Sequence, residues 1–584
     1  MRVQHPWRLI SGIVVVAVVA IVGYTGWLVY DAAHHLQDAA DDASAIKAAA
    51  LAGDTSKAKA AIDDFSGHAH SAAKATGSPF WGLLTHVPGF GDDARGVRTA
   101  SDVADDLSDG ALTQLAGAVG DIDAVLPKNG AVDVAAVQGL VSPVADGHAA
   151  LDKARRQLDA VDPSGYVGSL KIRYRDLQSE VDDAAHTMDV ADHALQVLPQ
   201  MLGADGSHNY LLIMQNNAEI RATGGLPGAI SLINADHGKI RMVREVSAGA
   251  FGQAPAPVLP LQPAEQKIFG KNLGTYFQDA NLTPDFTRSA DLWKARWEQT
   301  QPEKIDGVIS LDTVTLSYLL TALGPVDVDG VRLTSDNVVD ELLSKAYARI
   351  PDPAAQDAFF AKVASTVFEK MMTFDGDRKA LLTAVGKAAD EHRLLIHDFD
   401  DAAQRHLDGT AVSGGLTSGD PKVDPQVGVY FADGTLSKMS YYLRYDTHVS
   451  ATSCTNGVQH LSGGLTLTST APKDAKTTLS RFVTGVNLPK SSRGDMLVAV
   501  YVYAPEGGTA SKFDDNDLDF DQFTAELDGR QVIGTWVLLQ PGQSQDLKWT
   551  MTSGAGQTGA TQVNVTPSVS QGTSSSTATS ACGG

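Results

Sequence analysis

The chain begins with an apolar run, and the spacing of its hydrophobic positions then changes from segment to segment. Residues 9–30 read LISGIVVVAVVAIVGYTGWLVY and carry no charge, which is typical of a helix long enough to cross a bilayer. Arg2 and Arg8 precede this run and Asp31 follows it, so the positive-inside rule predicts a cytoplasmic tail over residues 1–8 and an extracytoplasmic remainder. A cleaved signal peptide is the alternative, although its apolar region is usually shorter and ends at a small-residue cleavage site.

Residues 31–203 are rich in alanine, aspartate, leucine and valine, and apolar positions recur there every three or four residues. This spacing is typical of amphipathic helices, so we expect an all-α helical stalk or bundle. Four histidines fall on predicted helices: His34, His35, His68 and His70. We interpret them as solvated residues on helix faces, because no paired Glu-x-x-His metal pattern recurs in the segment.

The later segments change from mixed to all-β patterns. Residues 204–412 alternate β-type runs such as NYLLIMQ and GAISLINA with helical stretches such as TVTLSYLLTALG, which favours an α/β domain. Residues 413–553 contain alternating strands broken by Gly, Pro and Asn, which is typical of an all-β sandwich. Residues 554–584 form a Ser/Thr/Gly-rich C-terminal tail that we expect to be mostly flexible. The predicted protein is therefore multidomain.

The charge and the cysteine content limit the functions that the protein can have. The 584 residues include 46 Lys and Arg against 69 Asp and Glu, a net charge of −23 without a basic stripe, which argues against a nucleic-acid partner. Cys454 and Cys582 both follow the predicted membrane helix, where an isolated pair most simply forms a disulfide. Two unpaired thiols, or one lipidated cysteine, are the alternatives.

Polar residues gather between two apolar runs in the sequence QNNAEIRATGGLPG, at the end of a predicted strand. Open α/β sheets bind ligands at such strand ends, and amides, an acid–base pair and exposed glycine N–H groups suit a polar or anionic ligand. The candidate ligand-binding residues are Asn216, Asn217, Glu219, Arg221, Thr223, Gly224 and Gly225. The alternative is a tight connection closed by asparagines and glycines, with Glu219 and Arg221 as a local salt bridge.

Two further residues are candidates for the same cleft. Arg288 in PDFTRSADLW either lines the cleft or belongs to the start of a solvated helix. Asp312 ends the strand IDGVISLD, where it either reaches the cleft or caps the helix that follows. The chain has no Walker loop, dinucleotide fingerprint, nucleophile elbow or HExxH zinc motif, so we assign no catalytic residue and no metal ligand.

The sequence YLLIMQNNAEIRATGGLPGAISLINADHGKI resembles the signature of a bacterial family known only as domain of unknown function 4012. The stretches NLTPDFTRSADLW, IDGVISLDTVTLSYLLTALGPVDVDG and SKMSYYLRYDTHVSA are also similar to that family. The resemblance covers most of the chain and implies an N-terminal membrane helix, a long helical segment and then this motif. It implies no activity.

The order of elements more distantly resembles the LytR-CpsA-Psr family, anchored enzymes that transfer glycopolymers from a polyprenyl-pyrophosphate lipid to the cell wall. That resemblance implies a LytR-CpsA-Psr-like α/β domain, arginines that clamp pyrophosphate and aspartates that hold Mg²⁺. Leu226, Pro227 and Gly228 stand where the family's Arg-x-Asp motif would fall. The helix that should carry paired arginines is preceded by Arg349 and offers Gln356 instead.

The sequence therefore predicts a single-pass, extracytoplasmic cell-envelope protein with a non-catalytic ligand-binding or scaffolding role. Its expected partners are the membrane and a cell-wall glycopolymer or polyprenyl-linked ligand, with no cofactor. The alternative is a glycopolymer or phospho-group transferase that uses Mg²⁺ and a rearranged set around Arg221 and Glu219. A purely structural stalk protein is the third hypothesis, and it predicts a loop whose polar groups satisfy each other.

Overall fold

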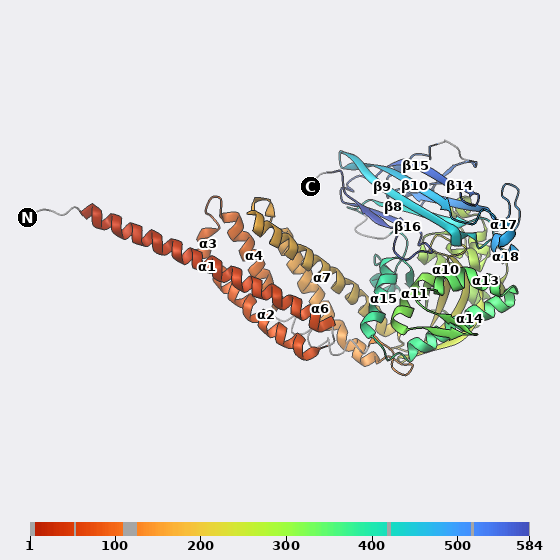
Figure 1. The fold of residues 1–584 in the computed structure, drawn as a ribbon, viewed down its shortest axis with the longest axis horizontal. Helices are drawn as coiled ribbons and strands as arrows, with labels where there is room; N and C mark the ends of the chain where they lie inside the picture. Colours follow the sequence, from red (N-terminus) through yellow and green to blue (C-terminus); the bar gives the residue numbers. More distant parts are fainter. Residues whose placement is uncertain (1–5, 52–53, 109–124, 417–421, 515–518, 583–584) are drawn as a thin grey trace, which may run out of the picture. The chain divides into compact units, whose positions relative to one another are not determined.

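A computed structural model describes residues 6–51, 54–108, 125–416, 422–514 and 519–582, and side chains in the first helix over residues 26–49 (Figure 1). The chain divides into two compact units. Unit 1 contains residues 1–126 and 133–199, and unit 2 contains residues 127–132 and 200–584. The segments that we expected as an α/β domain and a separate β-sandwich lie together in unit 2.

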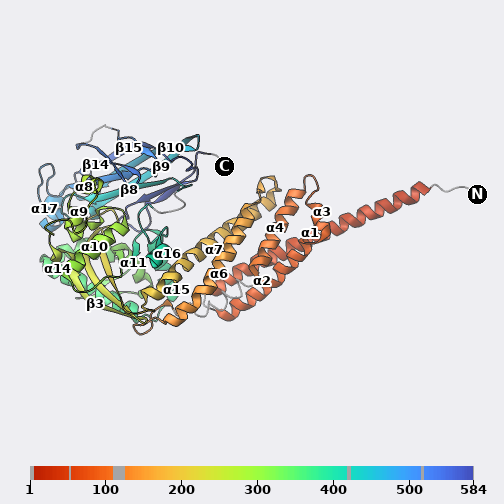
Figure 2. The ribbon, with the colours of Figure 1, turned by 180° about the vertical axis from the view of Figure 1, so that it is seen from behind.

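Unit 1 is helical, because its apolar residues recur at helical spacing and aspartates cap its helices. Asp54 accepts a hydrogen bond from the backbone N–H of Lys57, and Asp133 accepts one from Ala136. Helices α1 and α2, and α2 and α4, lie side by side (Figures 1 and 2). The elements of this region are α1 (Pro6–Leu51), α2 (Thr55–Thr76), α3 (Pro79–Leu84), α4 (Gly91–Ser108), α6 (Val134–Asp159), η2 (Pro163–Gly165) and α7 (Gly168–Met201).

The predicted transmembrane helix over residues 9–30 is corrected by the structure. In the described ranges, no helix is long and apolar enough to cross a membrane. The predicted span is not a helix of its own: α1 continues past Tyr30 through the acidic stretch DAAHHLQDAADD. Leu28, near the end of the predicted span, is buried against Trp81 and Leu84 inside unit 1. The single-pass topology and the membrane localisation depended on this helix and are corrected with it.

Unit 2 begins with a mixed five-stranded sheet in the order β3-β2-β1-β4-β7. Strands β1 and β4 are parallel, and the other neighbours are antiparallel. The strands are β1 (His208–Asn216), β2 (Leu226–Asp236), β3 (Lys239–Ser247), β4 (Gly307–Asp312) and β7 (Leu394–Asp398), with β5 (Val326–Val328) and β6 (Val331–Leu333) as a separate hairpin. One face of the sheet packs on a core that includes Trp293 and Trp297, which are fully buried.

Short and long helices accompany the strands of unit 2, and those at residues 439–442, 475–478 and 481–484 pack on the C-terminal core and not on the five-stranded sheet. The α-helices are α8 (Pro263–Phe269), α9 (Asn272–Thr275), α10 (Phe286–Thr300), α11 (Thr313–Leu323), α12 (Val338–Asp340), α13 (Ala346–Arg349), α14 (Pro353–Met372), α15 (Arg378–Asp390), α16 (Asp401–Leu407), α17 (Ala475–Thr478) and α18 (Arg481–Thr484). The other turns of helix are η3 (Ala248–Phe251), η4 (Phe277–Leu282), η5 (Glu341–Lys345) and η6 (Met439–Tyr442). Phe368 of α14 packs on the sheet face opposite the tryptophans, together with Ile240 and Met242 of β3.

Two further sheets form the C-terminal part of unit 2. The four-stranded sheet has the order β12-β15-β10-β9, and the six-stranded sheet has the order β13-β14-β11-β8-β16-β17. Strand β16 is parallel to β8. The strands are β8 (Gln426–Asp433), β9 (Leu443–Thr455), β10 (Val458–Ser469), β11 (Met496–Tyr503), β12 (Thr509–Ala510), β13 (Phe523–Leu527), β14 (Arg530–Leu539), β15 (Ser544–Thr552), β16 (Thr561–Val565) and β17 (Ser576–Ala578).

The inner strand β8 of the six-stranded sheet is buried on both faces. All residues of β8 are buried. Val429 and Phe431 face a core shared with Leu465 and Trp549 of the four-stranded sheet. Tyr430 points to the other side, into the core that contains the tryptophans of α10. This sheet therefore joins the sandwich to the α/β elements, so unit 2 is a layered body.

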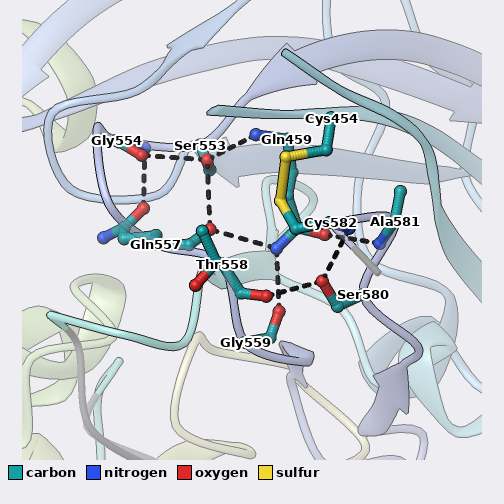
Figure 3. The surroundings of a disulfide bond; sticks show 10 residues. All are labelled: Cys454, Gln459, Ser553, Gly554, Gln557, Thr558, Gly559, Ser580, Ala581 and Cys582. Atoms are coloured by element: carbon teal, nitrogen blue, oxygen red, sulfur yellow. Dashed lines mark hydrogen bonds between the residues drawn. A yellow bond between two sulfur atoms is a disulfide. The ribbon is translucent and has the colours of Figure 1, made fainter. Parts of the chain in front are cut away.

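The C-terminal segment is tied to the sandwich by a disulfide. Cys454 in β9 and Cys582 are 128 residues apart and form the predicted bond, with a Cα–Cα distance of 4.8 Å (Figure 3). Beside it, the Gln459 amide accepts a hydrogen bond from the Ala581 backbone at 3.0 Å and donates to the Gly559 carbonyl at 2.8 Å. A disulfide of this kind is typical of proteins that fold in an oxidising compartment.

Candidate functional site

The predicted ligand-binding loop connects β1 to β2, at the edge where the parallel strands β1 and β4 end. Every residue from Asn217 to Gly225 is buried. The side chains of Glu219 and Arg221 are 7% and 3% exposed. We call residues 215–225 the signature loop.

The end of the signature loop is closed by Gln215. Its amide oxygen accepts hydrogen bonds from the Gly225 backbone at 2.8 Å, Thr223 Oγ1 at 3.1 Å and Asn281 Nδ2 at 3.2 Å. A side chain at Gly225 would place Cβ 2.3 Å from the carbonyl carbon of Asn216, so only glycine fits there. The glycines and Thr223 therefore close a turn against Gln215.

The charged residues of the signature loop pair with residues from other elements. Arg221 donates to Glu219 at 3.3 Å and to Asp279 of η4 at 3.1 Å, and Lys438 donates to the other oxygen of Glu219. Burial alone raises the pKa of Glu219, but the charges of Lys438 and Arg221 outweigh it and hold this pKa below its usual value. Opposite charges thus keep a buried carboxylate ionised.

Asp433, at the end of β8, lies beside this charged group. Its backbone N–H donates to the Ile220 carbonyl at 3.0 Å, and its Oδ1 accepts from Thr435 at 2.6 Å. Burial, followed by the nearby Glu219 carboxylate, raises the pKa of Asp433 to about 6. Its Oδ2 has no hydrogen-bond partner among the described residues.

The two asparagines are also engaged within the protein. Asn217 donates to Asp312 Oδ2 at 2.9 Å, and Asn216 donates to the hydroxyl of Tyr347. Asp312 is the N-cap of α11, where its Oδ1 accepts from the backbone N–H of Thr315 at 2.8 Å. The cap interpretation of Asp312 is the one that the structure shows, and the same carboxylate also holds the signature loop.

Arg393 is a buried charged residue that the sequence patterns did not single out as a candidate. Arg393, at the start of β7, is 1% exposed and donates to Asp312 at 2.7 Å and to Glu391 at 2.7 Å. It also donates to three carbonyls of the C-terminal segment: Ser568 at 2.8 Å, Ser570 at 2.6 Å and Gly572 at 2.9 Å. The available signal was an arginine opening the apolar run RLLIHDF.

The comparison with known families falls on this part of the molecule. Residues 205–347 match the family described as a protein of unknown function, DUF4012. This segment is a DUF4012 domain. The match confirms the first resemblance over residues 205–347, whereas the resemblance to the LytR-CpsA-Psr family stays a prediction. No curated protein and no solved structure matches the chain.

The DUF4012 domain contains only some of the buried residues that form hydrogen bonds and ion pairs around the signature loop. Asp279 and Asp312 lie within the matched segment, but Lys438 and Arg393 come from later elements. Arg288 also lies within the domain and has different partners. It donates to Glu265 at 2.7 Å and to the Pro260 carbonyl at 2.7 Å, and these hydrogen bonds do not join it to the signature loop.

Two cavities of unit 2 lie elsewhere. A groove of about 950 Å³ runs between strand β3 of the DUF4012 domain and helix α14, and its lining includes Met242, Val243, Glu245 and Glu369. A smaller cavity of about 250 Å³ is lined by residues that include Asp285 and Arg530. Neither lining includes Asn217, Glu219 or Arg221.

Proposed function

We propose that this protein is a non-catalytic scaffolding protein, in which the signature loop holds unit 2 together. One observation supports this role above others: the charged groups of the loop are buried and paired within the same unit. Glu219 pairs with Arg221 and Lys438, and Arg221 pairs with Asp279. A polar ligand would have to displace these partners before it reached Arg221.

The transferase alternative would need different surroundings for the same residues. Phosphoryl chemistry relies on arginines that reach the pyrophosphate and on aspartates that hold Mg²⁺. Arg221 and Arg393 are 3% and 1% exposed, and both donate to carboxylates of the protein. Asp312 already accepts hydrogen bonds from Asn217, Thr315 and Arg393. These contacts favour scaffolding over turnover.

A scaffold needs a surface that a partner can reach, and the groove beside β3 offers one. Val243 in this groove is 56% exposed. It is also the residue skipped in the pairing of β3 with β2, where Leu232 faces Arg244 and Ile233 faces Met242. Such a bulge turns the strand edge away from simple strand pairing. We therefore expect a partner to contact the side chains of the groove and not to extend the sheet.

Titration calorimetry of the full chain with inorganic pyrophosphate and Mg²⁺ tests the non-catalytic assignment. We expect no binding by the wild type or by Arg221→Met, and a lower unfolding midpoint for the variant. Arg332→Met is the control, because Arg332 forms an exposed ion pair with Asp327. Binding that Arg221→Met abolishes at unchanged stability would contradict scaffolding and favour the transferase.

Site-specific photo-crosslinking in the source cells tests the groove. A photoreactive residue at Val243 should give a discrete adduct, and Met242→Glu should remove it because that side chain lines the groove. The control position is Val486, which is 60% exposed and does not line the groove. Equal adducts from both positions, or an adduct that Met242→Glu leaves unchanged, would show that the groove is not the contact surface.

A further inference from the structure

Two histidines and one aspartate from α1 and α2 face one another in unit 1. The donor atoms of His35, Asp38 and His68, one from each side chain, all lie within 4.8 Å of one another. His35 and Asp38 are three residues apart on α1, so they share one helix face, and His68 comes from α2 alongside. The buried residues Ala39, Phe65 and Ala69 form an apolar cluster between the two helices nearby.

The orientation of His68 is fixed by a fourth residue. Its Nδ1 lies 2.7 Å from Asp42 Oδ2. An ionised carboxylate only accepts hydrogen bonds, so Nδ1 carries a proton. In the neutral ring, Nε2 then carries the lone pair. This atom faces Asp38, and the distance from Nε2 to Asp38 Oδ2 is 4.0 Å. Carboxylates that orient histidines in this way are typical second partners of metal ligands.

Two electron-pair donors that face each other attract a proton or a cation to the space between them. A proton shared by His68 and Asp38 would satisfy that pair alone. His35 is the third donor at the same place, and its buried Nδ1 has no hydrogen-bond partner among the described residues. Three converging donors favour a metal cation over a shared proton.

We propose that His35, Asp38 and His68 bind a divalent transition-metal ion of the zinc type. Imidazole and carboxylate ligands suit Zn²⁺, which takes four tetrahedral ligands, so water would complete this set. Bonds of about 2.0–2.1 Å place tetrahedral ligand atoms about 3.3 Å apart, which small rotations of the three side chains can reach. The side chains are 28%, 32% and 36% exposed, so an ion can enter from solvent. The ion would tie α1 to α2.

Calorimetric titration of the metal-stripped full chain with zinc chloride tests the proposal. We expect one equivalent to bind, with at least tenfold weaker binding in His35→Ala and in His68→Ala. Asp38→Asn keeps the side-chain size and should also weaken binding. Asp42→Asn removes only the orienting carboxylate, and loss of such a partner lowers metal affinity by about 10–100-fold. Zinc should also raise the melting temperature of the wild type in a concentration-dependent way.

The matched control is His70→Ala. His70 lies on α2 two residues from His68, but it pairs with Asp105 at 3.4 Å and is 73% exposed. This variant should bind zinc as the wild type does, and circular dichroism should show equal helix content in all variants. Undetectable zinc binding by the wild type would overturn the proposal, and so would binding that His35→Ala and His68→Ala leave unchanged.

Discussion

Arg221 and Asp279 are 58 residues apart in the sequence, yet Arg221 NH2 lies 3.1 Å from Asp279 Oδ1 in the interior of unit 2. The first residue belongs to the signature loop, and the second belongs to the short helical segment η4. Glu219 and Lys438 continue the same buried group. The signature loop is therefore joined to both the α/β elements and the sandwich by charge pairs.

Arg221→Met should destabilise the protein severely. Removing one partner of a buried ion pair leaves uncompensated charge, which costs about 3–5 kcal/mol. Glu219 would keep Lys438 as a partner, but Asp279 would lose its ion pair with Arg221. Denaturant unfolding followed by fluorescence measures the change. Arg332→Met removes an exposed pair and should change stability by less than about 1 kcal/mol. Similar losses in both variants would contradict the buried-pair argument.

Arg393→Leu should release the C-terminal segment. Arg393 donates to the carbonyls of Ser568, Ser570 and Gly572, and leucine cannot replace these hydrogen bonds. Hydrogen exchange read by mass spectrometry should show faster exchange after about residue 566. Arg405→Leu is the control, because Arg405 lies on the exposed side of α16. Unchanged exchange in Arg393→Leu would show that the disulfide and β17 hold the segment without it.

Reduction of the Cys454–Cys582 disulfide should lower the free energy of unfolding. A crosslink that spans 128 residues restricts the unfolded chain, and bonds of this kind contribute about 2–5 kcal/mol. Thermal unfolding with and without reductant measures the effect. The double variant Cys454→Ser with Cys582→Ser should melt like the reduced wild type and should not respond to reductant. A response of the double variant would mean that the reductant acts elsewhere.

Asp433→Asn should change how stability depends on pH. The folded state raises the pKa of Asp433 to about 6, through burial and the nearby Glu219 carboxylate, against an unfolded value of about 3.9. The folded state therefore binds the proton more strongly, and ionisation destabilises it as the pH rises from about 4 to 6. The variant should become more stable relative to the wild type as the pH rises through this window, and the stability difference should persist at higher pH. A stability difference between Asp433→Asn and the wild type that is constant with pH would contradict this prediction.

The sequence was informative where a local pattern decides the structure. Helical spacing predicted the helices after residue 31. The strand-end position of Asp312 left two roles open, and the structure shows the helix cap. The isolated cysteine pair predicted the disulfide. In each case the residues that set the structure lie close together in the chain or have only one available partner.

The charged network could not be predicted in the same way. Lys438 contacts the signature loop, and Arg393 contacts Asp312, from elements far along the chain. No spacing in the local sequence predicts those contacts. The burial of β8 on both faces also depends on which layers pack against it. The predicted transmembrane helix was wrong for a related reason: local hydropathy did not indicate that Leu28 packs against Trp81.

The parallel pairing of β16 with β8 determines when unit 2 can finish folding as the chain is synthesised. The signature loop is made early, but the Ala222 carbonyl accepts a hydrogen bond from Thr566, and Arg393 binds carbonyls as late as Gly572. When the ribosome has finished the DUF4012 domain, Thr566 and Gly572 have not yet been synthesised. Unit 2 can therefore complete its folding only after residues up to Gly572 have been synthesised, and a chain that terminates before β16 would expose the edge of β8 to other nascent chains.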